Sequence, residues 1–275
     1  MPSPDSPGVH HTSPVDAPLP TAKIVHRRDH TEDLFLLWLE PSIPFHFTPG
    51  QYITVGARGI ERPYSIVSAP HEPEIELFVE YVPPERGGKL TPLLYARDVG
   101  DVLTMRPIAK GRFTWRPGVA NHVMVATVTG IAPYVSMIRQ FVHERATGAV
   151  PPEPARFFVL QGGSYRDELV YDEELQTLGA RDPDLIRFVA SVSRPWADRN
   201  AGWSGPVGRI HLLVEEYLEL WRLSKADTLV YLCGHPGMID DASARLVPSG
   251  WSVVTERFWN PRRVSRPAAP TPDDT

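Results

Sequence analysis

The segment ERPYSIVSAP, residues 61–70, brings three chemically different groups within four positions. Arg62 carries a planar guanidinium whose fork of donors matches phosphate or carboxylate, while Tyr64 carries an aromatic ring and Ser65 a hydroxyl. Pro63 between them fixes the backbone and cannot donate to a strand ladder. Taken alone, the segment fits an edge strand with an exposed arginine and a core tyrosine equally well.

Two glycine-containing turns have the composition of phosphate-binding turns. In ATVTGIAPYVSM, residues 126–137, Thr129-Gly130 permits a sharp turn after an apolar run, and Pro133 suits the first turn of a following helix. GGKLTPLL, residues 87–94, places two glycines before a second short helix. The N–H groups at a helix N-terminus attract anions. Many such turns contain glycine and proline, however, and the second half of the chain lacks the G-x-G-x-x-G fingerprint.

Four further segments place charged or reactive groups where apolar runs end. They are ASVSRPW (190–196), GRI (208–210), LCGHPGM (232–238) and VVTERFW (253–259). Arg194 ends a predicted strand, and Arg209 lies at a predicted helix start. Cys233 precedes a break into glycine and proline, and Glu256 precedes an aromatic pair. A lone cysteine is also commonly a small buried hydrophobe.

The patterns that must position these groups divide the chain in two. Short alternating runs separated by turns predict six strands of a closed antiparallel barrel, followed by apolar runs that alternate with helices and predict a doubly wound parallel sheet. The barrel strands are predicted at 21–30, 34–40, 50–57, 62–69, 74–82 and 101–108, with a short helix within 87–97. The sheet strands are predicted at 122–128, 155–162, 184–192 and 227–234, with helices such as 132–146 and 208–220.

The bulk composition favours an ordinary two-domain protein. The 275 residues are 42% hydrophobic with a net charge of −5, so nothing favours nucleic-acid binding, and no apolar run is long enough for a membrane helix. The N-terminus lacks the pattern of a secretory signal, which favours the cytoplasm. We predict a disordered tail at 1–17, a barrel domain at 18–116, an α/β domain at 117–259 and a C-terminal extension at 260–275. One cysteine excludes an internal disulfide and a four-cysteine iron–sulfur cluster.

Together and in this order, the segments over about residues 20–259 resemble the ferredoxin–NADP⁺ reductase superfamily, most closely its bacterial ferredoxin/flavodoxin reductase branch. The resemblance implies an FAD-binding barrel followed by an NADP-binding α/β domain. On the FAD side it assigns Arg62 to the pyrophosphate, Tyr64 to stacking on the isoalloxazine and Ser65 to a hydrogen bond with the redox-active nitrogen. Pro63 fixes the backbone between them. The remaining FAD contacts are Glu80, Tyr81 and Val82 along the flavin, and Gly88, Lys89, Leu90 and Thr91 at the phosphates.

On the nicotinamide side, the resemblance assigns Thr129 and Gly130 to the ribose and pyrophosphate, and Cys233 to a position beside the reacting carbon. The family usually begins this turn with glycine, where this chain has Val128, a β-branched residue that does not easily take a positive φ.

Nucleotide choice is expected to depend on charge, because a 2′-phosphate needs cations, whereas NAD sites place a carboxylate on the ribose. Arg194 and Arg209 match the family positions that hold the phosphate. A third position, usually arginine, is Ser164 here, with Arg166 nearby as a substitute. These residues favour NADP(H) over NAD(H).

The C-terminal segment that contains Glu256 and Trp259 matches the part of the family that lies against the flavin or its adenine. A buried hydrophobic anchor is an equal interpretation of Trp259. Ser65, Cys233 and Glu256 are the expected catalytic residues, which position rings and move at most a proton. No metal is expected.

The electron acceptor is expected to be a separate ferredoxin or flavodoxin that docks on a monomer through surface arginines such as Arg27, Arg28 or Arg112. Two alternatives remain. One is an NADH-dependent flavin reductase component serving an oxygenase or another acceptor. The other is a non-catalytic binding module on the same scaffold.

Overall fold

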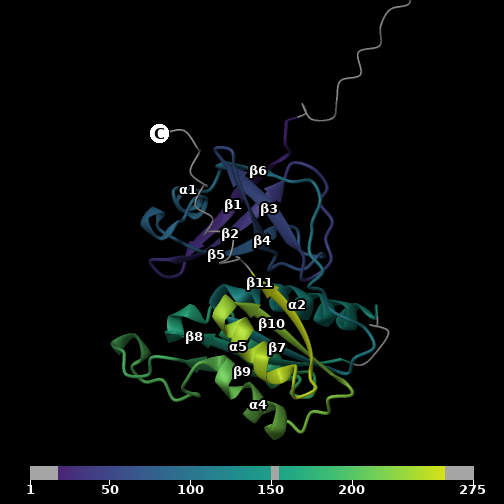
Figure 1. The fold of residues 1–275 in the computed structure, drawn as a ribbon. Coiled ribbons are helices and arrows are strands. Elements are labelled where there is room, and N and C mark those ends of the chain that lie inside the picture. Colours follow the sequence, from purple (N-terminus) through teal and green to yellow (C-terminus); the bar gives the residue numbers. More distant parts are fainter. Residues whose placement is uncertain (1–17, 150–154, 258–275) are drawn as a thin grey trace, which may run out of the picture.

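The computed structural model describes residues 18–149 and 155–257 of the chain. An antiparallel sheet lies next to a parallel one, and the chain passes from the first to the second once (Figure 1). The first sheet contains β1 (Thr21–Asp29), β2 (Leu34–Pro41), β3 (Tyr52–Ala57), β4 (Ile60–Ser65), β5 (Ile75–Glu80) and β6 (Val102–Met105). Between β5 and β6 lie the short helices η1 (Pro84–Arg86) and α1 (Thr91–Tyr95), the second of which was predicted.

The antiparallel sheet closes into the predicted barrel. Its strand order is β4-β3-β6-β1-β2-β5, so β4 and β5 are the two edges. A bridge between Ile66 and Leu77 joins these edges, and the Val67 N–H donates to the Glu76 carbonyl oxygen at 2.9 Å. Pairing the edges removes the exposed ladder groups that an open sheet would leave.

The strand predicted at 62–69 was displaced in the structure, where β4 covers Ile60–Ser65. A two-residue turn explains the early start, because Arg58 and Gly59 both have positive φ (51° and 78°), as in a type I′ hairpin. This turn pairs Ala57 with Ile60 directly. The strand ends at Ser65 because the following residues leave β3 and bridge to β5.

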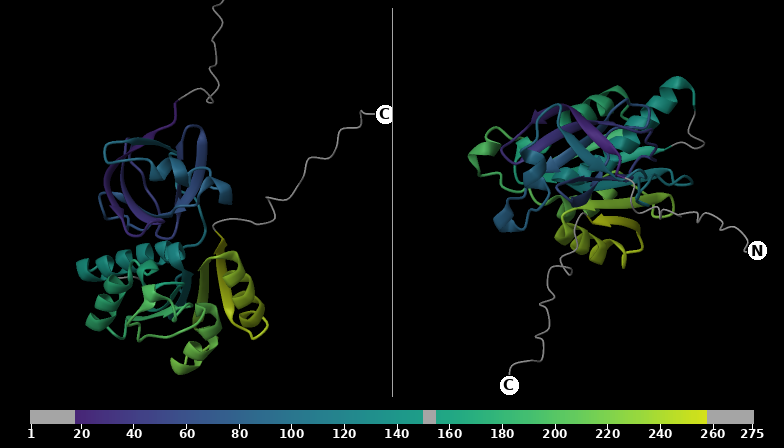
Figure 2. Two further views of the ribbon diagram at one scale, coloured as in Figure 1. Left: turned by 90° about the vertical axis from the view of Figure 1, so that its left-hand side faces the viewer. Right: turned by 90° about the horizontal axis from the view of Figure 1, so that it is seen from above.

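The second sheet is parallel and has strand order β11-β10-β7-β8-β9, the doubly wound arrangement that was predicted. Its strands are β7 (Asn121–Thr127), β8 (Arg156–Gly163), β9 (Ile186–Val192), β10 (Thr228–Gly234) and β11 (Ser252–Arg257). Its helices are η2 (Val128–Ile131), α2 (Ala132–Thr147), η3 (Arg166–Glu168), α3 (Asp172–Arg181), η4 (Asp198–Asn200), α4 (Ile210–Leu220) and α5 (Pro236–Leu246). Helices α2 and α3 cover one face, and α4 and α5 the other (Figure 2).

Strand β2 shows how the barrel attaches to the sheet. Phe35 and Leu37 point into the barrel core, whereas Leu34 and Leu36 belong to a cluster shared with α2. Both faces of β2 are therefore buried, which explains its nearly continuous apolar sequence. Among the described residues, no helix combines the length and apolar character needed to cross a bilayer.

A histidine lies in the core of the parallel sheet. His122 on β7 is fully buried; its Nε2 accepts from the Trp115 indole N–H at 3.0 Å, and its Nδ1 lies 3.3 Å from the Tyr231 hydroxyl. Burial lowers the pKa of His122 from 6.5 to about 4. The folded protein therefore holds this ring neutral at pH values where the unfolded chain would protonate it.

We expect the free energy of unfolding to fall as the pH drops from about 6.5 toward 4, because in this range His122 is protonated in the unfolded state but stays neutral in the folded state. The full shift corresponds to about 3 kcal/mol. Urea unfolding at a series of pH values measures this. The variant His122→Phe should lose the part of the slope that lies between these pH values, whatever its stability at pH 8. An unchanged slope in the variant would contradict the assignment.

Candidate active site

The carboxyl ends of the parallel strands face the barrel, and β11 ends against it close to β4 and β5 (Figure 1). Strand β7 lies between β8 and β10 in the sheet. The chain continues from β7 to β8 and β9 on one side of β7, and then crosses to β10 and β11 on its other side. This is the point at which the strand order reverses. In open α/β sheets, ligands bind outside the carboxyl ends at such a point.

The turns after β7 and β10 are packed against each other at this point. A Cβ on Gly130 would lie 2.3 Å from the Cys233 carbonyl oxygen and 2.9 Å from the Gly234 Cα. A Cβ on Gly234, whose φ is +127°, would lie 2.3 Å from the Thr127 Oγ1. That hydroxyl oxygen also accepts from the His235 N–H at 2.8 Å. Only glycine at 130 and 234 permits this contact, and Pro133 lies in the first turn of α2, as predicted.

The turn keeps a positive φ although it begins with valine. Val128 has φ 43°, a conformation that is costly for a β-branched residue. Its side chain packs against the core cluster around α2. A β-branched residue does not easily take a positive φ, yet the backbone here adopts the glycine-like conformation under strain.

The strain at Val128 can be isolated by comparing two variants that both remove the isopropyl group. We expect Val128→Gly to be more stable than Val128→Ala by about 1 kcal/mol, because only alanine keeps the left-handed penalty. This order is the reverse of that in a helix interior. Thermal unfolding of the two proteins measures the difference. If the alanine variant is the more stable, residue 128 is not held at positive φ.

The three predicted catalytic residues meet where β4 faces the parallel sheet. Ser65, at the end of β4, is 8% exposed and lies close enough to the Glu256 carboxyl on β11 to affect its pKa. Burial raises the pKa of Glu256 to about 7, while the Ser65 side chain opposes the rise. Within the described residues, Oε2 of Glu256 is buried without a partner. This carboxyl group is therefore able to hold or release a proton near neutral pH.

Cys233 lies opposite Glu256 in the register of β10 and β11 and is fully buried. Burial, and then the Glu256 charge, raise the pKa of the Cys233 thiol well above its usual range. The group is consequently a neutral thiol rather than a thiolate nucleophile. Cys233 therefore places an uncharged, polarisable sulfur atom close to the Gly130 turn.

Strand β4 does not present its three predicted groups to one side. Tyr64 pairs with Ile53 and Arg62 with Val55, so strand alternation places Arg62 and Tyr64 on one face and Ser65 on the other. A ligand that contacts all three must lie along the edge of β4. Tyr64 is half-buried, and burial raises the pKa of its phenol, which stays neutral. Arg62 is exposed, donates to the Glu61 carbonyl oxygen at 2.7 Å and has no carboxylate partner among the described residues.

The predicted phosphate cap precedes α1. A Cβ on Gly88 would lie 1.7 Å from the Val82 carbonyl oxygen, so this position requires glycine. The Thr91 hydroxyl accepts from the Val82 N–H and donates to the Val82 carbonyl, both at 3.0 Å, and thereby holds the segment after β5. Leu90 is buried and Lys89 is exposed. The N–H groups of Lys89, Leu90 and Thr91 find no acceptor within the described part of the chain.

The other residues predicted along the flavin lie at the end of β5. Tyr81 is half-buried with its ring centroid 4.8 Å from that of Tyr95. Most of the Glu80 side chain is accessible to solvent. The pKa of its carboxyl is nevertheless raised, first by desolvation and then by the negative charges of Asp33 and Glu168.

Of the arginines suggested for partner docking, Arg27 has a side chain only 13% exposed. It pairs with Asp29 and donates to the Tyr95 carbonyl, so it supports the barrel. Arg28 and Arg112 are exposed.

The expected nucleotide-selective residues lie at the ends of β8 and β9. Arg194 and Arg209 are both exposed, and the side chain of Arg209, the residue before α4, has no hydrogen-bond or ion-pair partner among the described residues. The Arg166 guanidinium donates from Nη1 to the Ala201 carbonyl oxygen at 3.4 Å. Sequence reasoning missed Tyr165, which contacts Arg194 directly. Predicted Trp259 lies outside the described residues.

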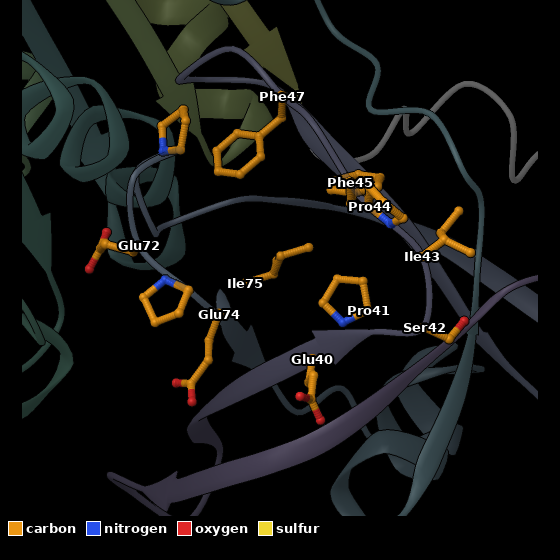
Figure 3. Close-up of a pocket in the computed structure, with 12 residues that line it drawn as sticks. Glu40, Pro41, Ser42, Ile43, Pro44, Phe45, Phe47, Glu72, Glu74 and Ile75 are labelled. Atoms are coloured by element: carbon orange, nitrogen blue, oxygen red, sulfur yellow. The ribbon is translucent and has the colours of Figure 1, made fainter.

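An open hollow of about 430 Å³ lies elsewhere on the barrel, between the segments 40–47 and 70–75 (Figure 3). Phe47, Phe45 and Ile75 supply apolar surface, and Glu40 and Glu74 lie at its border. None of the predicted site residues lines it, so it does not mark the chemistry described above.

Comparison with known proteins agrees with this geometry. Residues 124–244 match the family described as Oxidoreductase NAD-binding domain. The chain is 29% identical over 232 residues to a flavodoxin/ferredoxin–NADP reductase of Escherichia coli, covering 80% of this chain and 87% of that protein. It is 32% identical over 242 residues to the reductase component of a propane 2-monooxygenase of Mycolicibacterium goodii, covering 84% and 65%.

Among solved structures, a ferredoxin NADP⁺ reductase from Neisseria gonorrhoeae with bound FAD and NADP superposes with a TM-score of 0.73 at 24% identity. The match covers 89% of this chain and all of that one. The same arrangement of barrel and parallel sheet is therefore present in that reductase. The chain belongs to the ferredoxin–NADP⁺ reductase superfamily and is an oxidoreductase.

Proposed function

We propose that the protein is an FAD-dependent oxidoreductase that transfers electrons between NADPH and a separate one-electron carrier such as ferredoxin or flavodoxin. The observation that supports this most strongly is the close packing of the turns after β7 and β10 at the switch point, where Gly130 contacts the Cys233 carbonyl oxygen. The R-P-Y-S strand of the barrel reaches the same region, because Ser65 acts on the Glu256 carboxyl of β11. Action as a cytoplasmic monomer is part of the proposal; the mass in solution and cell fractionation test it.

The residues present fit FAD. Arg62 is a cation without an ion-pair partner in the described part, as a pyrophosphate ligand needs to be. Free N–H groups precede α1 on a backbone that Gly88 brings against Val82. Half-buried Tyr64 offers an aromatic face, which suits a flat heteroaromatic ring. Arg62, Tyr64 and the segment 88–91 would hold the cofactor.

Bound FAD would supply the conversion between two-electron hydride chemistry and one-electron transfer, which no side chain performs. The chain's own residues bind and orient. The Ser65 hydroxyl favours the ionised form of Glu256, and the Glu256 carboxyl, with its pKa of about 7, exchanges a proton at Oε2, which has no partner among the described residues. Cys233 and the Gly130 turn exclude water from the same point because both are buried.

A second candidate function is an NADH-dependent reductase component of an oxygenase. The identity to the reductase component of a propane 2-monooxygenase favours it. The single cysteine cannot supply a four-cysteine cluster, so an iron–sulfur acceptor would be carried by another domain or protein.

Rapid-mixing measurements separate the two functions. The protein is reduced without oxygen by NADPH or by NADH and is then mixed with oxidised flavodoxin or ferredoxin. We expect NADPH to have the higher kcat/KM and both reduced forms to pass electrons to the carrier at the same rate. A preference for NADH, or a carrier that stays oxidised, would support the oxygenase component instead. A protein that takes up no FAD would contradict both.

A further inference from the structure

A tyrosine between two arginines lies at the edge of the parallel sheet where β8 and β9 end. Arg194 donates from Nη1 to the Tyr165 hydroxyl oxygen at 2.8 Å, and its guanidinium carbon lies 5.4 Å from the ring centroid. The guanidinium carbon of Arg199 lies 4.0 Å from the same centroid. Such contacts fix the direction of the ring. Sequence patterns gave no reason to place these three residues together.

The two loops that carry this cluster are joined by one buried amide. Asn200 is 2% exposed, and its Oδ1 accepts from the Arg166 N–H at 2.7 Å. Its Nδ2 donates to the carbonyl oxygens of Ser164 at 3.0 Å and Arg194 at 2.8 Å. The backbones on either side of Tyr165 and at Arg194 are therefore held in one arrangement. A preformed arrangement of this kind lowers the entropic cost of ligand binding.

Two arginines and two carboxylates lie in or beside this cluster. Arg199 pairs through two hydrogen bonds, at 2.6 and 2.9 Å, with Asp167, which compensates its charge. The Glu168 carboxylate accepts from the backbone N–H groups of Ser164 and Tyr165. Arg194 donates to the neutral Tyr165 phenol and has no carboxylate partner among the described residues.

Arg209 lies at the same edge. The Gly208 N–H before it donates to the Val192 carbonyl at the end of β9, at 2.9 Å. Arg194 on the Tyr165 phenol and Arg209 near the end of β9 thus provide two cations without a carboxylate partner among the described residues, and this combination favours a phosphate dianion.

We propose that the Tyr165 hydroxyl is a direct ligand of the 2′-phosphate of NADP(H), and that Arg199 and Asp167 position it. The inference rests on the proposed function and names a selectivity residue within it. Because its oxygen accepts from Arg194, the phenol proton is free to point away and to donate to a phosphate oxygen. Arg194 retains four further N–H donors for the same phosphate. Tyr165 then supplies the contact that Ser164, with its short side chain, does not.

Calorimetric titration of the purified holoenzyme with 2′,5′-ADP and with 5′-AMP tests the proposal without turnover. We expect Tyr165→Phe to weaken 2′,5′-ADP binding about 10-fold or more, the usual loss for a hydrogen bond to a charged group. Binding of 5′-AMP should not change. Arg166→Gln tests the alternative ligand expected from the sequence; because its guanidinium donates to a backbone carbonyl, we expect a smaller loss than in Tyr165→Phe. A loss in Arg166→Gln with no loss in Tyr165→Phe would overturn the assignment.

A double-mutant cycle separates a ligand from a residue that only holds Arg194. If Tyr165 contacts the phosphate, Tyr165→Phe still weakens 2′,5′-ADP binding in the Arg194→Ala background. If it has no further effect there, Tyr165 acts only through Arg194, and the proposal is wrong. Arg199→Gln should produce a smaller loss than Tyr165→Phe, because it removes the support and leaves the hydroxyl.

The same titrations distinguish this inference from the proposed function. A protein that binds 2′,5′-ADP no more tightly than 5′-AMP contradicts the phosphate site, even if it is yellow and reduces a carrier. A protein that binds 2′,5′-ADP through Tyr165 but retains no FAD contradicts the proposed function alone.

Discussion

Replacing Gly130 by alanine is expected to lower the rate of reduction by NADPH by more than about 100-fold, the scale of loss that a displacement of about 1 Å produces at a reacting centre. The new methyl group would meet the Cys233 carbonyl oxygen at 2.3 Å and the Gly234 Cα at 2.9 Å, and both are backbone atoms that cannot rotate away. The turn must therefore move away from β10. Rapid mixing with NADPH under anaerobic conditions measures the rate.

Gly148→Ala provides the control for this substitution. Gly148 has φ +75° but nothing within 4 Å of its missing Cβ, so alanine there costs only about 1 kcal/mol of backbone strain. We expect the control to be reduced as rapidly as the wild type, and FAD content to be the same in all three proteins. If Gly130→Ala is reduced at the wild-type rate, the turn after β7 does not hold the nicotinamide.

Replacing Arg139 by alanine is expected to destabilise the protein by about 3–5 kcal/mol, the cost of leaving a buried charge without its partner. Arg139 on α2 donates to Glu76 of β5 at 2.6 Å and to both carboxylate oxygens of Glu174 at 2.7 Å. Glu76 is 4% exposed and also accepts from the Tyr171 hydroxyl at 2.8 Å. This network joins the barrel to α2 and α3. Urea unfolding at pH 7 measures the loss.

Arg145→Ala is the matched control, because Arg145 lies on the same helix and pairs with Asp182 at the surface. An exposed pair of this kind contributes at most about 1 kcal/mol. Adding Glu76→Gln to Arg139→Ala should recover part of the stability, since the amide is neutral. Equal losses in the two arginine variants would show that the junction between barrel and α2 does not depend on the buried charge.

Most of the fold could be predicted because local signals and tertiary structure agree. Strands β8 and β10 of the parallel sheet are apolar runs that end in glycine, and Pro133 and Gly148 mark the two ends of α2. Strand β2 was recognised even though burial on both faces removes its alternation. The position of β4 was predicted wrongly because Arg58-Gly59 forms a tight turn in which both residues have positive φ, a conformation that arginine rarely adopts.

The site could be predicted only in part. Single segments such as R-P-Y-S and the Gly130 turn are visible in the sequence, but their contacts are not. Ser65 lies near Glu256 only because the whole barrel packs on the carboxyl edge of the sheet. Tyr165 meets Arg194 because buried Asn200 joins two loops, and an asparagine in an irregular segment carries no such signal in one sequence.

Anaerobic titration of the purified protein with NADPH, followed by its visible absorption, decides whether the protein is an NADPH-dependent flavoprotein. If the seam between β4 and the switch point holds FAD, the protein is yellow and loses its flavin absorbance as about one equivalent of NADPH is added. Tyr64→Ala, which removes the aromatic face, should retain less FAD. A colourless preparation that takes up no FAD, or a yellow one whose absorbance NADPH leaves unchanged, would contradict the account.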